Sequence, residues 1–179
     1  MRALPIFVIS FAVAVPASAQ PRKPAAPAHP APASNEPKQV GKFEDWTAAT
    51  HRESGQTVCY AFTRAQSSSP VLLGRGQVVL TVTERPSIRD SVAIEAGYAF
   101  PPNTTVTVQV DRTGLDFFTD QRNAFARDGK AAVAVLQKGA RAIARFPGPK
   151  DAEVTDTFSL RGFGAAYAAI VKTCPPQKS

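Results

Sequence analysis

Residues 105–111, TVTVQVD, alternate valine with polar side chains and give the clearest single indication of the fold. A repeat of two residues is typical of a β-strand that buries one face and exposes the other. The same alternation appears in residues 56–63 (QTVCYAFT), 77–84 (QVVLTVTE) and 91–96 (SVAIEA). The sequence therefore predicts an all-β domain of antiparallel strands, with one buried face per sheet.

Two segments depart from this alternation and predict short helices. Residues 130–138 follow Asp128, a favourable helix cap, and precede Gly139, a favourable helix end. Apolar residues between positions 163 and 171 recur at helical spacing and predict a second helix near the C-terminus. We expect this C-terminal helix to place its apolar side on the sheet, because such a side is stable when it is buried.

The composition limits the size and the class of the protein. The chain has 179 residues, with 21 Lys and Arg against 14 Asp and Glu, and a formal net charge of +7. This length fits one ordinary domain, and no apolar run reaches the roughly 18 residues that a membrane span needs. Only two Cys and two His are present, which excludes zinc fingers and iron–sulfur clusters, so we expect no metal and no cofactor.

The N-terminal residues have the features of an export signal. Arg2 precedes an apolar stretch at residues 3–15, and residues 17–19 (ASA) form a cleavage signature. We therefore expect a signal peptide, residues 1–19, that is cleaved after Ala19. Cleavage there would deliver a periplasmic or secreted protein.

A segment rich in proline and alanine follows, and it cannot bury a hydrophobic core. Residues 20–40 are expected to form an extended, disordered linker, which acts either as a spacer between the domain and a surface or as a plain tail. The folded domain is then expected to span residues 41–176.

Export changes the interpretation of the two cysteines. In an oxidising compartment two lone cysteines pair with each other, which predicts a structural disulfide between Cys59 and Cys174. The alternative is a pair of reactive thiols. Neither a CxxC motif nor an electropositive setting accompanies Cys59, and the structural bridge is the preferred interpretation.

No constellation in the sequence indicates catalysis. His51 lies in a polar stretch, residues 50–55, which predicts a hairpin turn, and no G-x-S-x-G elbow accompanies it. Residues 74–76 (GRG) are too short for a phosphate-binding loop. The clustered carboxylates are expected to be solvated, without a separated acid and base; they are Glu44 and Asp45, Asp116 and Asp120, and Asp151, Glu153 and Asp156. We therefore expect no catalytic residues and no enzymatic activity.

The basic residues are scattered along the chain and form neither a stripe nor a motif with stacking aromatics. This pattern argues against a nucleic-acid partner. A modest positive balance instead favours contact with anionic surfaces, such as lipopolysaccharide, phospholipid or host glycans.

Several short motifs together resemble a known family. Phe43 and Trp46 form a Phe-x-x-Trp start, Cys59 follows one strand later, and residues 159–166 read SLRGFGAA, an S-L-x-G-F-x-x-A element. Arg85-Pro86 and Lys138-Gly139 occupy further matching places. Over residues 41–174 the chain resembles the invasion-associated locus B family of exported alphaproteobacterial proteins.

The resemblance implies a β-sandwich, in the immunoglobulin-like class, with a terminal helix and a place in the periplasm or at the outer surface. The family offers no established catalytic residues to carry over. This sequence also departs from the family pattern, because residues 117–125 (FFTDQRNAF) hold none of the additional cysteines that many members have there.

Three functions are compatible with these observations. The first is a non-enzymatic recognition module that binds an envelope or host-surface protein, or an anionic polymer, through residues 64–76 and 116–128. The second is a small envelope-modifying enzyme, which requires a cleft with convergent polar groups and shifted pKa values. The third is a purely structural role in the envelope. In contrast to the enzyme, a recognition module would expose an apolar or basic patch. The sequence predicts no particular oligomeric state.

Overall fold

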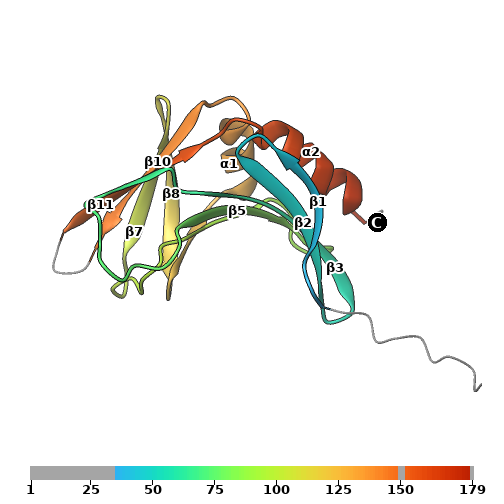
Figure 1. Ribbon diagram of the computed structural model, residues 1–179, viewed down its shortest axis with the longest axis horizontal. Helices are drawn as coiled ribbons and strands as arrows, with labels where there is room; N and C mark the ends of the chain where they lie inside the picture. The colour runs from blue at the N-terminus through green and yellow to red at the C-terminus, as the bar shows by residue number, and fades with distance from the viewer. Residues whose placement is uncertain (1–34, 149–151, 178–179) are drawn as a thin grey trace, which may run out of the picture. The chain divides into compact units, whose positions relative to one another are not determined.

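Eleven strands and two helices make up the part of the chain that the computed structural model describes, residues 35–148 and 152–177 (Figure 1). The predicted signal peptide and the linker as far as residue 34 lie outside this part. The elements are β1 (Lys38–Phe43), β2 (Trp46–Glu53), β3 (Gln56–Arg64), β4 (Ser67–Ser69), β5 (Val79–Glu84), β6 (Ser91–Glu95), β7 (Thr105–Val110), β8 (Thr113–Asp120), β9 (Asn123–Ala126), α1 (Gly129–Leu136), β10 (Arg141–Pro147), β11 (Glu153–Ser159) and α2 (Phe163–Thr173).

The strands form one antiparallel sheet in the order β1-β2-β3-β5-β6-β9-β8-β7-β10-β11-β4. The sheet curls over its own core, because β4 follows β3 directly along the chain and yet pairs with β11 at the other end of the order. Gln66 bridges the two ends, since its backbone N–H donates to the Thr157 carbonyl oxygen (2.8 Å). The predicted all-β, sandwich-like fold is confirmed.

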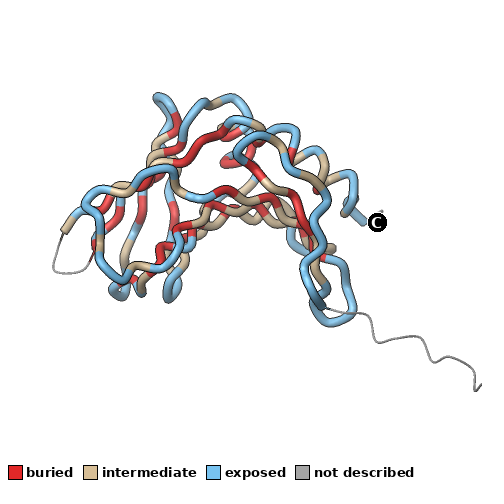
Figure 2. Tube along the Cα trace, in the orientation of Figure 1, coloured by how far each residue is buried: buried red, intermediate tan, exposed pale blue. Residues whose placement is uncertain are grey.

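Alternation along the strands decides which side of the sheet is buried. In β5 the side chains of Leu80, Val82 and Glu84 are buried, whereas the intervening threonines remain half-exposed. Figure 2 shows the buried positions in red along the strands that enclose the core. The largest fully buried side chains are aromatic: Trp46, Phe117, Phe146, Phe158 and Phe163.

The structure corrects several local predictions. Strand β1 begins at Lys38, so the last three residues of the expected linker belong to the sheet. Strands β4 and β9 lie in segments where the alternation predicts no strand. His51 lies within β2 rather than in a turn, and the turn itself falls at Ser54 and Gly55.

Both predicted helices are present. Asp128 caps α1, since its side-chain oxygen accepts a hydrogen bond from the backbone N–H of Ala131 (2.9 Å). The helix ends at Leu136, two residues before the predicted end. α2 packs on the inner side of β1, β2 and β3, and buries Phe163, Ala166 and Ile170 there.

The two ends of the domain meet where the β1–β2 turn contacts the start of α2. The Trp46 indole Nε1–H donates to the carbonyl oxygen of Ser159 (2.9 Å), 113 residues later in the chain. The Ser159 hydroxyl donates to Asp45 Oδ2 (2.6 Å). The Trp46 and Phe163 rings lie 4.7 Å apart, between centroids. The Phe-x-x-Trp and S-L-x-G-F motifs are therefore two halves of one packing contact, which we call the Trp46 junction.

Gly162 allows this close approach. Its φ is 86°, and a Cβ at this position would lie 2.1 Å from the Phe43 carbonyl oxygen. Only glycine meets both requirements without movement of the backbone.

A disulfide joins Cys59 of β3 to Cys174 at the C-terminal end of α2, as predicted, with a Cα–Cα distance of 6.0 Å. The bridge closes a separation of 115 residues and fixes the end of α2 that lies away from the Trp46 junction.

We predict that Gly162→Ala lowers the free energy of unfolding by at least about 2 kcal/mol, because strain from the positive φ adds to the clash with Phe43. Gly164→Ala is the matched control, since its Cβ would meet nothing within 4 Å and the helix favours alanine. Urea unfolding measures both variants. Equal stability of the two would contradict this account of the junction.

Replacement of both cysteines by alanine should lower the free energy of unfolding by roughly 3–5 kcal/mol, because the bridge restricts a long loop of the unfolded chain. Denaturant titrations with and without a reductant test this. The wild type should lose stability when reduced, and the double variant should be insensitive to the reductant; a wild type that is equally stable in both would contradict it.

Candidate functional site

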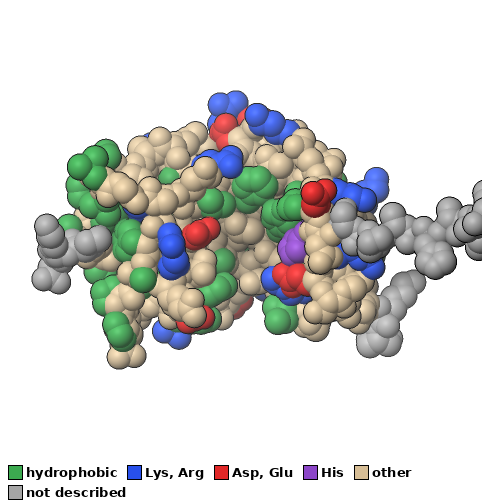
Figure 3. Space-filling model, turned by 60° about the horizontal axis from the view of Figure 1, so that its bottom comes forward, with side chains coloured by type: hydrophobic (Ala, Val, Ile, Leu, Met, Phe, Trp, Pro, Cys, Tyr) green, Lys and Arg blue, Asp and Glu red, His purple; other side chains and the backbone are tan. Residues whose placement is uncertain are grey.

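The surface carries charges of both signs. Figure 3 shows Lys and Arg side chains interspersed with Asp and Glu on the face that it presents, with hydrophobic side chains around a central hollow.

Among the described residues no group of His, Cys, Asp and Glu is arranged to hold a metal ion. No described helix is long and apolar enough to cross a membrane.

His51 belongs to a surface ion network. Its Nε2 lies 2.9 Å from Glu53 Oε1, and Arg85 donates two hydrogen bonds to the same carboxylate (2.9 and 3.0 Å). These contacts with Arg85 and His51 lower the pKa of Glu53 to about 2. The network links β2 to the segment after β5. His51 therefore has a structural role in this contact.

The clustered carboxylates have different environments. Glu44 is exposed and pairs with Arg161 (2.8 Å), whereas Asp45 accepts the hydrogen bond of the Trp46 junction. Asp116 and Asp120 are exposed on β8. The expectation that all of them are solvated is wrong for Asp156, which is fully buried in β11.

Asp156 forms a buried, bidentate ion pair with Arg75, whose two terminal nitrogens lie 2.8 and 2.6 Å from its carboxylate oxygens. Arg75 also donates from Nε to the Ala96 carbonyl oxygen (2.7 Å), and its guanidinium lies 5.0 Å from the centroid of the Tyr98 ring. Each polar atom of the guanidinium group thus finds a partner, as a buried charge requires. The pair holds the β4–β5 connection against the sheet.

Next to the Arg75–Asp156 pair, the β4–β5 connection exposes aliphatic side chains. Val71 is 81% exposed and Leu73 is 99% exposed, in the segment Pro70–Gly74, which we call the apolar tip. Leu72 between them packs on the core cluster. The tip lies within the stretch 64–76 that the sequence proposed for recognition.

A second buried charged group fastens α2. Glu84 is fully buried; its Oε1 accepts from the Asp90 backbone N–H (3.2 Å), and its Oε2 lies 2.5 Å from Arg89 Nε. Oε2 finds no hydrogen-bond donor of suitable geometry among the described residues. Burial, followed by the neighbouring Asp90, raises the pKa of Glu84 to about 7. The Tyr167 hydroxyl of α2 donates to Asp90 Oδ1 (2.5 Å).

These contacts continue to the C-terminal end of the helix. Arg89 Nη1 donates to the Cys174 carbonyl oxygen (2.8 Å), and Glu84 pairs in the sheet with Cys59, the other half of the disulfide. Burial, together with Asp90, also raises the pKa of Tyr167. The group therefore acts as a fastener between α2 and the β5–β6 connection.

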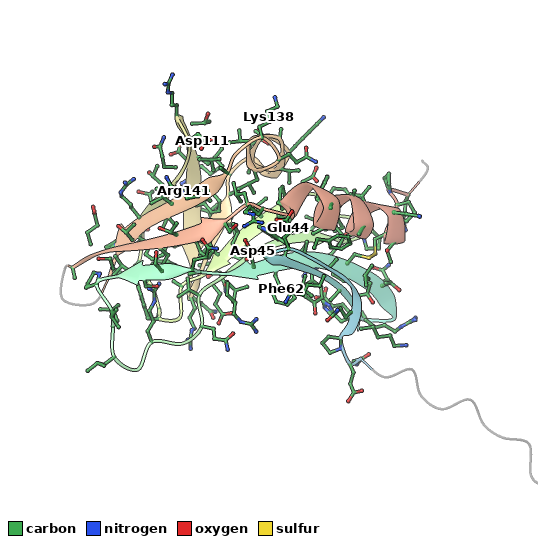
Figure 4. The ribbon with its side chains drawn as sticks, turned by 45° about the horizontal axis from the view of Figure 1, so that its top comes forward. Glu44, Asp45, Phe62, Asp111, Lys138 and Arg141 are labelled. Carbon is green, nitrogen blue, oxygen red and sulfur yellow. A yellow bond between two sulfur atoms is a disulfide. The ribbon has the colours of Figure 1, made fainter. Side chains whose placement is uncertain are left out.

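Shallow clefts open on the surface of the domain. One, of about 270 Å³, is lined by Glu44, Asp45 and Phe62 with neighbouring residues of β1 and β3. Another, of about 240 Å³, lies between Asp111 and Lys138. Figure 4 labels these residues and shows the two groups on different parts of the domain.

Comparisons with known proteins agree with this architecture. A family model described as "Invasion associated locus B (IalB) protein" matches residues 46–171. The crystal structure of invasion associated protein B from Bartonella henselae is similar, with a TM-score of 0.56 and 16% identity, over 74% of this chain and 95% of that chain. At that identity the likeness concerns the fold alone. No curated protein matches the chain in sequence.

The buried Glu84 predicts how stability depends on pH. Its pKa is about 7 in the folded protein against an ordinary value of 4.5, so the folded state binds the proton more tightly than the unfolded chain. This contribution is complete below pH 4.5 and is lost as the pH rises through 7. We expect the free energy of unfolding to fall by up to about 3 kcal/mol over this range.

Urea unfolding at intervals from pH 4.5 to 7.5 measures the effect, and Glu84→Gln provides the control because an amide does not titrate. The variant should have a flat profile between these values. A wild-type profile that is flat, or a variant profile that is as steep as the wild type, would show that Glu84 does not titrate in this range.

Proposed function

Because the chain belongs to the invasion-associated locus B family, we propose that it is an exported, non-enzymatic recognition module of the cell envelope that binds a protein partner through its apolar tip. Family membership and the Cys59–Cys174 disulfide support export to an oxidising compartment. A periplasmic or secreted location after cleavage behind Ala19 is part of this proposal.

The observation that carries the proposal is the exposure of Val71 and Leu73 on an anchored segment. Exposed aliphatic side chains that lie together are a feature of binding surfaces. The buried Arg75–Asp156 pair and the hydrogen bond from the Gly76 N–H to the Gly97 carbonyl oxygen (3.2 Å) hold the base of the segment. Anchoring lowers the conformational entropy that binding would otherwise remove, so a preformed tip binds more tightly.

The alternative of an envelope-modifying enzyme finds less support. A catalytic site combines shifted pKa values with a cleft that admits a substrate. The raised pKa values of Glu84 and Tyr167 arise instead in contacts that fasten α2 to the sheet. Those side chains already have structural partners.

The stretch 116–128, which the sequence also proposed for recognition, contributes a sheet face to the surface. It forms β8 and β9, and its exposed Phe118 lies beneath the Arg127 guanidinium, 5.8 Å from the ring centroid.

The double variant Val71→Ser, Leu73→Ser should lose at least about tenfold in recovery of a crosslinked envelope protein, because burial of each aliphatic side chain contributes about 1.5–3 kcal/mol. The measurement is crosslinking in source cells that express the exported protein, followed by pull-down and mass spectrometry. Stability should not change, since these side chains have few contacts to lose.

Ile88→Ser is the matched control, since Ile88 is an exposed aliphatic residue (57%) in the β5–β6 connection. It should leave recovery of the partner unchanged. Equal recovery with the wild type and the double variant would refute binding through the tip, and equal losses in the variant and the control would indicate nonspecific adhesion.

A further inference from the structure

The solvent side of the sheet carries a continuous row of side chains. Registered pairs place Thr47, Phe62, Thr81, Ala93, Phe125 and Phe118 side by side on β2, β3, β5, β6, β9 and β8. All six side chains are half-buried or exposed. The residues that alternate with them along the strands point inward. We call this surface the outer face.

Aromatic pairs lie at both ends of the row. The rings of Tyr60 and Phe62 are 5.9 Å apart and inclined by 28°, and those of Phe118 and Phe125 are 5.6 Å apart and inclined by 29°. Between them lie only the small side chains of β5 and β6. Three strand spacings separate Phe62 from Phe125, a distance of about 14 Å.

The outer face is concave. Figure 1 shows β2, β3 and β5 arching away from β7 and β8, with both helices on the opposite side of the sheet. Figure 3, which brings this underside forward, shows a hollow with hydrophobic side chains on its walls. The cleft of about 270 Å³ that contains Phe62 also includes Thr47 and Arg64, so it opens at one end of the row.

Charges of both signs surround the row. Arg64 lies over Phe62 and Arg127 over Phe118, each with 5.8 Å between guanidinium carbon and ring centroid. Three carboxylates share the face, because Glu95, Asp116 and Asp120 alternate with the buried residues of β6 and β8. A strongly anionic or cationic polymer would meet repulsion somewhere along this surface.

The middle of the row is polar as well as small. Thr81 and Thr83 of β5 point outward, and no side-chain hydrogen bond joins their hydroxyls to another described residue. An apolar helix or a second aromatic face would remove water from these hydroxyls without replacing its hydrogen bonds, which is costly. A ligand that offers hydroxyl groups would replace them.

We propose that the outer face binds an uncharged oligosaccharide chain. A sugar ring has a face of C–H groups that packs on an aromatic ring and an edge of hydroxyls that form hydrogen bonds, which matches aromatic rings beside threonine hydroxyls. Phe62 and Phe125 provide the stacking surfaces, and Thr81 and Asn123 provide hydrogen-bonding groups. The proposal is independent of the apolar tip, which lies on the β4–β5 connection.

NMR titration of the purified, exported, ¹⁵N-labelled protein with chitohexaose, cellohexaose and maltohexaose tests this proposal. At least one hexasaccharide should shift the amide signals of β3, β5 and β9. The double variant Phe62→Ala, Phe125→Ala should weaken that binding by at least about tenfold, and Thr81→Val should weaken it while the shape of the side chain is retained.

Ile143→Ala on β10 is the matched control, because Ile143 is half-buried and lies outside the row. It should bind as the wild type does. Thermal unfolding checks that each variant is folded, and Thr81→Val decides the outcome if the double phenylalanine variant fails to fold.

Three results would overturn the proposal. The first is the absence of amide shifts with all three hexasaccharides at millimolar concentration. The second is binding that both Phe62→Ala, Phe125→Ala and Thr81→Val leave unchanged. The third is a wild-type dimer in sedimentation velocity that Phe62→Ala dissociates, which would assign the outer face to a second copy of the chain.

Discussion

The hydrogen bond from the Trp46 indole to the Ser159 carbonyl oxygen joins the first hairpin of the domain to the segment that starts α2. One such bond contributes only about 1 kcal/mol, but it satisfies the polar atom of a fully buried tryptophan, which would otherwise destabilise the core. Phe163 packs on the same ring, so the position of α2 follows from this contact. The other features of the structure depend on that position.

α2 is then held along its whole length. Gly162 and Phe163 fix its first turn, Tyr167 reaches Asp90 in its middle, and Cys174 is bonded to β3 at its end. All three contacts lie on the inner side of the sheet. The outer face is therefore left without a covering element in the described part of the chain (Figure 1).

Much of the architecture could be predicted from local patterns. Alternation identified β3, β5, β6 and β7, and Asp128 identified the start of α1, because these signals depend only on neighbouring residues. The three serines of β4 carry no such signal; that strand exists because the curled sheet brings Thr155 and Thr157 alongside it. The polar neighbours of His51 predict a turn, but the residue lies in a strand that β1 and β3 flank on both sides.

The functional surfaces were harder to predict, because they depend on contacts between distant residues. Arg75 lies in a short glycine-flanked segment that carries no signal of an ion pair, and its partner Asp156 lies 81 residues away. The outer face depends on the registers of six strands, which alternation alone does not specify. The family motifs identified the Trp46 junction, which is structural, rather than any binding surface.

The central claim is that long-range contacts hold the binding surfaces in place before a partner arrives. Backbone ¹⁵N order parameters for residues 71–76 test it most directly, because an anchored segment differs from a free loop on the picosecond to nanosecond timescale. The account predicts values near about 0.85, as in the strands. Values below about 0.6 would show a flexible loop and would contradict the account.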